Sequence, residues 1–375
     1  MSLGRKIERS TKRFWYGIID TFLRNERFEG KLKPAEVRKV LFLRNDAIGD
    51  MIVTLPTFRL LKELIPTVEI HVLASPVNAP LLKNDPNLDR VIIYDGNLLK
   101  SFKKLSSLRS EKYDVIFSCR ITKITDNGIL ANIISDRDTV KVTTWAEPLR
   151  YVFFNKQSHL AQKPEKMWEK MAALVLDTIE TDHTGIPEIE PYIATNAESN
   201  VTADAELDKL SFLKKKFIAI NISTRNERNR WTTEGYQFVI KEFLKENPTA
   251  KVLILWMGDD EAQARQIITG YEDRAALYRR TADIMEIVRV VENAACVLST
   301  DTGIVHICSA VKTPVLAMYV GENHPARLWE PYKIPFRAIE TEGDNYVATL
   351  EPEQVWSEFK NLLDEIPLFF LISIR

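Results

Sequence analysis

Short runs of apolar residues alternate with segments of helical periodicity along most of the chain. Apolar runs bounded by turn residues predict buried strands, and the longer periodic segments between them, beginning with 50–65, predict helices. This alternation is typical of βαβ units, so the pattern predicts an α/β protein with two doubly wound parallel sheets in tandem. The expected strands are 39–44, 69–74, 90–95 and 113–119 in the first half, and 216–223, 250–258, 294–303 and 313–321 in the second.

A stretch around 181–200, rich in Pro, Thr, Asn and Glu, predicts the connection between the two sheets. We expect an amino-terminal extension over 1–35, a first domain over 36–190 and a second domain over 191–345. A helical tail over 346–375 is expected to pack back on the first domain. Ligands of open α/β sheets collect beyond the carboxyl ends of the strands, so two such domains predict an interdomain cleft with one ligand bound by each.

Composition and charge narrow the class of protein. The chain has 375 residues, 45% apolar and 27% charged, as expected for a globular protein in water. Its 51 basic and 52 acidic residues nearly balance, which argues against a nucleic-acid partner. The three cysteines and five dispersed histidines show no metal-ligand spacing, so neither a metal site nor a disulfide framework is expected.

The next question is whether the chain spans or contacts a membrane, and the amino-terminal segment is the part that bears on contact. No apolar run reaches the roughly 18 residues of a spanning helix, and no secretory signal is visible, so a cytoplasmic protein is expected. Residues 1–33 carry nine Lys or Arg against four Asp or Glu, interleaved with aromatic and aliphatic side chains. This mixture suits peripheral contact with the inner face of the cytoplasmic membrane. A helix docked on its own domain has the same pattern, and both interpretations stay open.

The stretch LSTDTGIVHICSAV, 298–311, predicts a buried strand that turns directly into a helix. The amino end of a helix attracts anions, Gly303 allows close approach to the backbone, and Thr302 adds a hydroxyl donor. A phosphate or diphosphate suits such a turn. Asp301 as a helix cap and Gly303 as a turn residue would explain the same letters without any ligand.

The stretch RNDAIGD, 44–50, joins the first strand to the first helix and holds two carboxylates. Asp46 can cap the helix, and Gly49 can allow tight backbone geometry. Asp50, in the first turn, can take a proton from an incoming hydroxyl at the rim of a cleft. It can also simply stabilise the helix dipole, and the residues taken alone favour that structural role.

Two loops that follow predicted strands of the second half carry charge. In the first, guanidinium groups can grip a phosphate, although a solvated basic loop looks the same. In the second, an acid can bind ribose hydroxyls or cap a helix. The residues are Arg225, Arg228 and Arg230 in the first loop, and Asp259, Asp260 and Glu261 in the second.

Taken together and in order, LRNDAIGDMIVTLPTFRLLKELIP (43–66) and STDTGIVHICSAVKTPVLAMYVG (299–321) resemble the heptosyltransferases of lipopolysaccharide core assembly, glycosyltransferase family 9. The likeness spans roughly residues 38–335. It implies a two-domain GT-B fold, an ADP-heptose donor, a glycan or lipid-linked glycan acceptor, and an inverting transfer that needs neither metal nor cofactor.

The resemblance also implies roles for individual residues. Asp50 matches the general base of the family. Asn45, Asp46 and Gly49 lie on the acceptor side. The donor-side residues are Asp301, Thr302, Gly303 and His306 around the diphosphate and sugar, Glu261 at the ribose, and Arg228 and Arg230 in the basic loop.

One departure from the family concerns Asn229, two residues before Trp231, where a lysine that contacts phosphate is common. Arg228 or Arg230 can supply the missing charge, or the donor differs. Asn229 favours an alternative function, a non-catalytic nucleotide-sugar-binding protein with a degenerate site. A nucleotide-dependent oxidoreductase is a further alternative, which the lack of a GxGxxG after the first strand disfavours.

Overall fold

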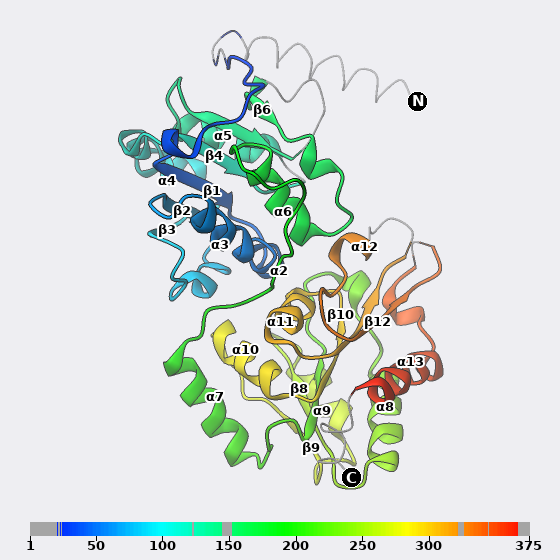
Figure 1. The fold of residues 1–375 in the computed structure, drawn as a ribbon. Helices are drawn as coiled ribbons and strands as arrows, with labels where there is room; N and C mark the ends of the chain where they lie inside the picture. Colours follow the sequence, from blue (N-terminus) through cyan, green and yellow to red (C-terminus); the bar gives the residue numbers. More distant parts are fainter. Residues whose placement is uncertain are drawn as a thin grey trace, which may run out of the picture. The chain divides into compact units, whose positions relative to one another are not determined.

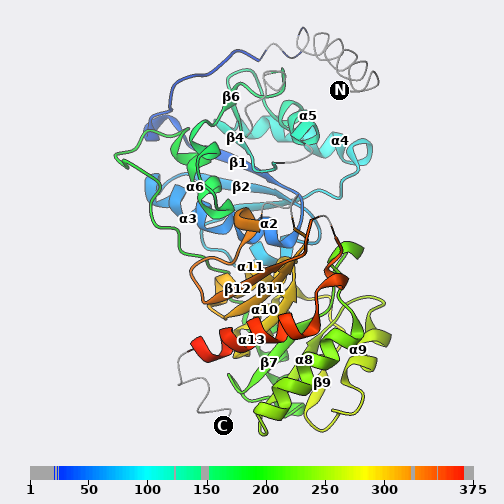
Figure 2. The same cartoon turned by 90° about the vertical axis from the view of Figure 1, so that its right-hand side faces the viewer.

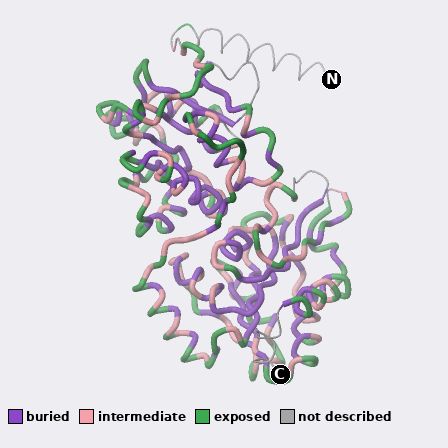
Figure 3. The backbone as a smooth tube through the Cα atoms, in the orientation of Figure 1, coloured by how far each residue is buried: buried purple, intermediate pink, exposed green. Residues whose placement is uncertain are grey.

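The structure is a computed structural model that describes Thr21, Leu23 and residues 25–121, 124–144, 152–321, 326–343 and 345–366. The chain forms two compact units, residues 1–189 and 190–375, here called unit 1 and unit 2 (Figure 1). The expected domain boundary lies one residue later. Each unit has its own sheet, and Figure 3 shows the buried residues concentrated along the strands of both.

Unit 1 contains a six-stranded sheet in the order β3-β2-β1-β4-β5-β6, with parallel pairing throughout. This is the doubly wound order in which the direction of winding reverses between the first and fourth strands. The strands are β1 (Lys39–Arg44), β2 (Glu69–Ala74), β3 (Arg90–Ile93), β4 (Val115–Ser118), β5 (Val140–Thr143) and β6 (Lys156–Gln157).

Helices cover both faces of the unit 1 sheet, and this is why its strands are apolar on both sides. On one face Phe42 of β1 packs edge-on against Phe58 of α3, with ring centroids 4.9 Å apart. On the other face Leu41 and Leu43 join the core beneath α4 and α5, which lie side by side (Figure 2). The helices are α2 (Ile48–Ile52), α3 (Leu55–Leu64), α4 (Leu98–Ser107), α5 (Ile124–Ile134) and α6 (Met167–Leu176).

Unit 2 repeats the same topology, with the sheet order β12-β11-β10-β7-β8-β9. Helices α7, α10 and α11 cover one face and α8, α9 and α13 the other (Figure 1). Thr232 caps α8 by accepting the Gly235 N–H at 3.0 Å. The strands are β7 (Phe217–Asn221), β8 (Lys251–Leu255), β9 (Ala275–Leu277), β10 (Cys296–Thr300), β11 (Val315–Tyr319) and β12 (Phe336–Glu340); the helices are α7 (Ala197–Lys209), α8 (Thr233–Glu246), α9 (Glu261–Ile268), α10 (Ile284–Asn293), α11 (Gly303–Val311), α12 (Ala326–Trp329) and α13 (Pro352–Glu365).

The expected strands are confirmed, with ends that differ by a few residues. Four strands were not expected, namely β5, β6, β9 and β12, because they are short or contain polar residues such as Lys141 and Arg337. The single helix expected over 50–65 is two helices. Helix α2 ends at Ile52 and α3 begins at Leu55, with a proline in its first turn, where a missing N–H costs nothing.

The carboxyl-terminal helix departs from expectation. Val355, Phe359 and Leu362 of α13 are buried in the core of unit 2, where the helix packs against α8 and β12. The expectation that 346–375 packs on the first domain is therefore wrong for the described part of this segment. The apolar face of α13 covers the sheet of unit 2. The sequence predicts that this face is buried but does not say against which sheet.

The described part of the expected extension is joined to unit 1. The Phe28 N–H donates to the Asn155 carbonyl at 2.8 Å, and Leu32 forms a parallel bridge with Ile179. The interpretations of 1–33 as a membrane contact or a docked helix lie mostly outside the described residues. Among the described residues, no helix is both long and apolar enough to cross a membrane.

Candidate functional site

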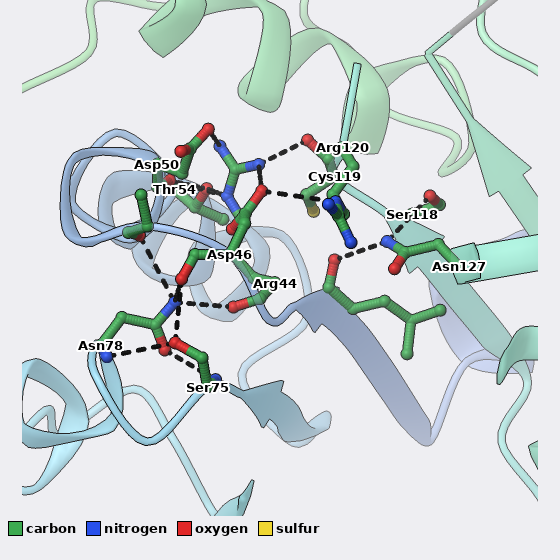
Figure 4. Close-up of polar contacts among 12 residues, drawn as sticks. Arg44, Asp46, Asp50, Thr54, Ser75, Asn78, Ser118, Cys119, Arg120 and Asn127 are labelled. Carbon is green, nitrogen blue, oxygen red and sulfur yellow. Dashed lines mark hydrogen bonds and ion pairs between the residues drawn. The ribbon is translucent and has the colours of Figure 1, made fainter. Parts of the chain in front are cut away.

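The crevice of unit 1 lies where the winding reverses, at the carboxyl ends of β1 and β4. Strand β1 ends at Arg44, and Asn45 and Asp46 lead the chain into α2. The Arg44 side chain is only 1% exposed, so its charge requires partners. Figure 4 shows polar groups from β1, α2, β4 and the loop after β2 gathered around it.

Arg44 binds three segments of the chain at once. Its Nε donates to the Asp50 carbonyl at 2.7 Å and to the Thr54 hydroxyl at 2.9 Å (Figure 4). Its Nη1 donates to the Cys119 carbonyl at 2.7 Å. These bonds hold α2 and the end of β4 against β1. Sequence reasoning missed Arg44, although an arginine that ends an otherwise apolar strand, shortly before two acids, is a readable signal.

Asp46 and Asp50 share this guanidinium. Asp46 Oδ2 lies 3.1 Å from Nη1 of Arg44, and Asp50 Oδ1 lies 3.4 Å from Nη2. A second arginine, Arg120, lies 3.9 Å from Asp46 Oδ2. The Asp50 side chain is 25% exposed and that of Asp46 is 16% exposed. Asp50 is therefore the more accessible of the two acids.

Asp46 does not cap α2, because Ala47 occupies the N-cap and no side chain caps that helix. Burial raises the pKa of Asp46 to about 6, against the pull of Arg44 in the opposite direction. Burial also opposes the charge of Arg44, but Asp46 and Asp50 outweigh it and raise the pKa of the guanidinium.

The raised pKa of Asp46 predicts a pH dependence of stability. The folded chain binds this proton more tightly than the unfolded chain, so the stabilisation is fully present below the ordinary pKa of 3.8 and is lost as the pH rises to about 6. Asp46→Asn has no such titration. The free energy of unfolding of the variant relative to that of the wild type should therefore rise by roughly 2 kcal/mol between about pH 4.5 and about pH 7. This corresponds to a relative rise in Tm of roughly 4–8 °C. Calorimetry of both proteins across this range measures the effect, and a constant Tm difference would show that Asp46 is already ionised at the acid end.

The loop after β2 fixes the turn between β1 and α2 from outside. Asn78 Nδ2 donates to the carbonyls of Arg44 at 2.9 Å and Asp46 at 3.2 Å, and Ser75 Oγ donates to the Asp46 carbonyl at 2.8 Å (Figure 4). The turn is thereby held in one geometry without a helix cap. Neither Asn78 nor Ser75 was predicted, because nothing local marks a side chain that binds a turn about thirty residues earlier.

Several buried oxygens at this edge have no hydrogen-bond partner within the described ranges of the chain. They lie beyond β1, on α5, and at the end of β5, all near the carboxyl edge of one parallel sheet. Buried polar atoms are normally satisfied, so such a group indicates a place where a polar ligand completes the bonding. The atoms are Asn45 Oδ1, Asp46 Oδ1, Asn127 Oδ1, Thr143 Oγ1 and Thr144 Oγ1.

The corresponding crevice of unit 2 lies at the carboxyl ends of β7 and β10. Thr302 is the N-cap of α11, and its Oγ1 accepts the Ile304 N–H at 3.3 Å. The structural alternative, in which Asp301 caps the helix, is therefore wrong. Asn221, at the end of β7, donates to Thr302 Oγ1 at 3.3 Å and to Ser299 Oγ at 3.1 Å, so it orients the turn from the neighbouring strand.

His306 lies one turn into α11, behind this turn. Its side chain is buried, and its ring packs edge-on against Trp329 of α12 with centroids 5.7 Å apart. Asp301, Thr302 and Gly303 thus gather at the amino end of the helix, and His306 packs in the interior beside α12.

Asn229 replaces the lysine that the family resemblance leads one to expect, and it is buried. Its Nδ2 donates to the Asp301 carbonyl at 3.0 Å, which ties the basic loop to the α11 turn. Arg230 binds two acids, Asp260 at 2.8 Å and Glu227 at 3.0 Å. The Arg228 guanidinium lies over the Tyr346 ring, 5.8 Å from its centroid.

Two of the three acids after β8, Asp260 and Glu261, take different positions. Asp260 is buried and accepts the Ser223 hydroxyl at 2.9 Å, at the loop that follows β7. Glu261 is 45% exposed on α9, where it pairs with Arg265 at 2.6 Å. Asp260 is therefore occupied by contacts with the first loop, whereas the Glu261 carboxylate remains exposed on α9. The assignment of Glu261 to the ribose stays a prediction, because the sequence alone does not distinguish adjacent acids.

Two Rossmann-like sheets in tandem, each with polar side chains at its reversal point, are the architecture of the GT-B fold. The structure matches that of a glycosyl transferase family 9 from Veillonella parvula with a TM-score of 0.73 at 16% identity, covering 90% of this chain and 99% of that one. It also matches Escherichia coli heptosyltransferase WaaC with ADP-2-deoxy-2-fluoro heptose, with a TM-score of 0.66 at 18% identity and coverage of 86% and 99%. The predicted fold class is confirmed.

Sequence comparison identifies the family. The chain is 21% identical over 352 residues to lipopolysaccharide heptosyltransferase 3 of Escherichia coli, covering 84% of this chain and 96% of that relative. The family model of glycosyltransferase family 9 (heptosyltransferase) matches residues 102–347. The chain therefore belongs to glycosyltransferase family 9 and is a glycosyltransferase. The oxidoreductase alternative is wrong. The matched residues include the whole crevice of unit 2 and begin after the turn that holds Asp50.

Proposed function

We propose that this protein is an inverting heptosyltransferase that moves a heptose from ADP-heptose to a lipopolysaccharide or related cell-surface glycan. The family match over 102–347 carries the proposal, because it contains every donor-side residue named above. Two similar proteins support the proposed donor and acceptor. The WaaC structure holds an ADP-heptose analogue, and the Escherichia coli relative is a lipopolysaccharide heptosyltransferase.

The donor diphosphate binds at the turn of unit 2 in this proposal. The amino end of α11 and the Thr302 hydroxyl face the negative charge that grows as the nucleotide leaves. We assign the missing phosphate cation to Arg228, because it lies next to Asn229 in the loop that Asn229 ties to the Asp301 carbonyl. Glu261 remains the proposed ribose contact, since its carboxylate is exposed, with Asp260 anchoring the same loop to Arg230.

The acceptor binds at the crevice of unit 1. The attacking sugar hydroxyl lies beside Asp50, whose side chain is 25% exposed, and Asp50 takes its proton. The deprotonated oxygen forms a bond to the anomeric carbon from the face opposite the diphosphate, whose bond to that carbon breaks. Arg44 positions Asp50 through its backbone carbonyl and compensates the charge of its carboxylate.

We propose that the transfer needs no divalent cation. Support comes from the donor-side arginines and from the described part of the chain, where no group of three or more His, Cys, Asp or Glu side chains is arranged to hold a metal. Activity measured with ADP-heptose should be the same before and after treatment with EDTA. A loss that Mg²⁺ or Mn²⁺ restores would contradict this part of the proposal.

Ligand-induced stabilisation tests the identity of the donor. ADP at about 100 times its Kd should add about 2.7 kcal/mol, or roughly 5–10 °C in Tm, whereas UDP, GDP and NAD at the same concentration should add little. Release of ADP from ADP-heptose in the presence of a heptose-deficient lipopolysaccharide acceptor then tests transfer. Stabilisation by UDP or GDP in place of ADP would overturn the donor assignment and leave the family unchanged.

A further inference from the structure

Helix α4 of unit 1 exposes two large apolar side chains. Leu99 is 91% exposed and Phe102 is 54% exposed, and residues three apart lie on the same side of a helix. Leu105 of the same helix is buried in the core, so α4 has an inner apolar face that packs and an outer one that is largely exposed to solvent. An exposed Leu–Phe pair on a regular helix calls for an explanation.

The charges around this pair are positive. Helix α4 has the sequence LLKSFKKLSS, without an acid, and Lys100, Lys103 and Lys104 are all exposed. Lys104 Nζ donates to the Ile93 carbonyl at 2.9 Å, which keeps its charge close to the half-exposed Ile93 side chain. The nearest preceding acid, Asp95, accepts the Asn97 N–H at 2.9 Å and so turns toward the start of the helix.

Leucine and phenylalanine flanked by lysines match an anionic lipid surface more closely than they match a protein. The rings and methyl groups enter the boundary of the acyl chains, and the lysine stems follow them while the ammonium groups reach the phosphates. A protein interface instead tends to contain few lysines. We propose that Leu99, Phe102, Lys100, Lys103 and Lys104, here called the α4 surface, dock the protein on an anionic membrane.

The position of α4 in the fold connects membrane docking with the Arg44 crevice. The helix follows β3 after a short loop, so its amino end lies at the carboxyl edge of the sheet that also carries the Arg44 crevice, and it packs beside α5 (Figure 2). Docking there would hold the crevice near the head group of a lipid-linked acceptor. This last step rests on the proposed function, whereas the binding to lipid does not.

Vesicle flotation of the full-length protein tests the α4 surface. Vesicles of phosphatidylcholine with and without phosphatidylglycerol should show binding that depends on the anionic lipid and falls with salt. Lys100→Gln with Lys103→Gln should weaken partitioning about 25-fold, since each lysine contributes about 1 kcal/mol, or about fivefold. Leu99→Ser with Phe102→Ser should weaken it at least tenfold, because both side chains lose their burial in lipid.

Matched variants in unit 2 provide the controls. Val201→Ser with Leu213→Ser removes two other exposed apolar side chains, and Lys209→Gln with Lys245→Gln removes two other exposed lysines. These proteins should float like the wild type. Equal flotation of the α4 variants and the wild type would overturn the proposal and direct attention to residues 1–33. A self-association lost only in the Leu99 and Phe102 variant, without lipid binding, would assign the surface to a second copy and overturn it as well.

Transfer assays separate this inference from the proposed function. The α4 variants should retain full activity on a water-soluble acceptor fragment and lose it on acceptor embedded in anionic vesicles. If the wild type floats but transfers no heptose to either acceptor, the proposed function fails and the docking surface stands.

Discussion

Asp50→Asn should lower kcat about 10²- to 10⁴-fold, the range expected when a general base is removed. The Kd for ADP should stay unchanged, because Asp50 belongs to unit 1 and the proposed nucleotide site belongs to unit 2. The fold should persist as well, since Arg44 bonds the backbone carbonyl of residue 50, which the substitution leaves in place. Initial rates of ADP release, together with calorimetric titration of ADP, measure both quantities.

A matched control separates catalysis from helix electrostatics. Glu198 also lies exposed in the first turn of its helix, α7, and Glu198→Gln removes the same kind of dipole interaction. This variant should keep its kcat. If Asp50→Asn also turns over at the rate of the wild type, Asp50 has only the structural role of a first-turn acid, and Asp46 becomes the next candidate for the base.

Arg44→Met should destabilise unit 1 by about 3–5 kcal/mol, the cost of removing one member of a buried ion pair. The substitution leaves the Asp46 carboxylate without its closest cation and takes a donor from the carbonyls of Asp50 and Cys119. Thermal unfolding followed by calorimetry should show a Tm lower by roughly 10 °C. Arg44→Lys should recover part of this loss, since an ammonium keeps the charge but cannot bridge both carbonyls.

Arg90 offers the matched control for this experiment. Its side chain is 47% exposed and lies 2.7 Å from Glu111, so Arg90→Met should cost less than about 1 kcal/mol. Combining Arg44→Met with Asp46→Asn should restore stability relative to Arg44→Met alone, because the unpaired buried charge disappears with the aspartate. Additive effects of the two substitutions would mean that Arg44 and Asp46 contribute independently, contrary to the geometry.

The core strands could be predicted from the sequence because both faces of a parallel sheet are buried. β1 and β2 have the limits expected from their apolar runs. β6 and β12 could not be predicted in the same way, since Lys156 and Arg337 interrupt their patterns and their pairing depends on strands already in place. The placement of α13 failed for a related reason, as an amphipathic helix encodes that it is covered but not by what.

Some residues of the candidate site can likewise be predicted from local sequence, and others cannot. Asp50 and Thr302 stand out because each lies at the start of the helix that follows a strand, where local sequence already points to the carboxyl edge of a sheet. Asn78 and Asn127 are at the same edge but come from a loop and a helix that only folding brings to β1. The choice between Asp260 and Glu261 likewise depended on side-chain direction, which no spacing reveals.

By itself the sequence determined the two Rossmann-like sheets, the turn at Asp301 and the pair of acids before α3, because apolar periodicity and contiguous polar turns are local properties. Tertiary structure alone decided that Arg44 is buried between Asp46 and Asp50, that Asn229 holds the Asp301 carbonyl, and that Leu99 and Phe102 remain outside the core. Each of these depends on contacts between residues distant in the chain or on the side of a helix that finds no neighbour. Burial, charge pairing and exposure are set by the packing of whole elements, and a linear pattern does not contain that packing.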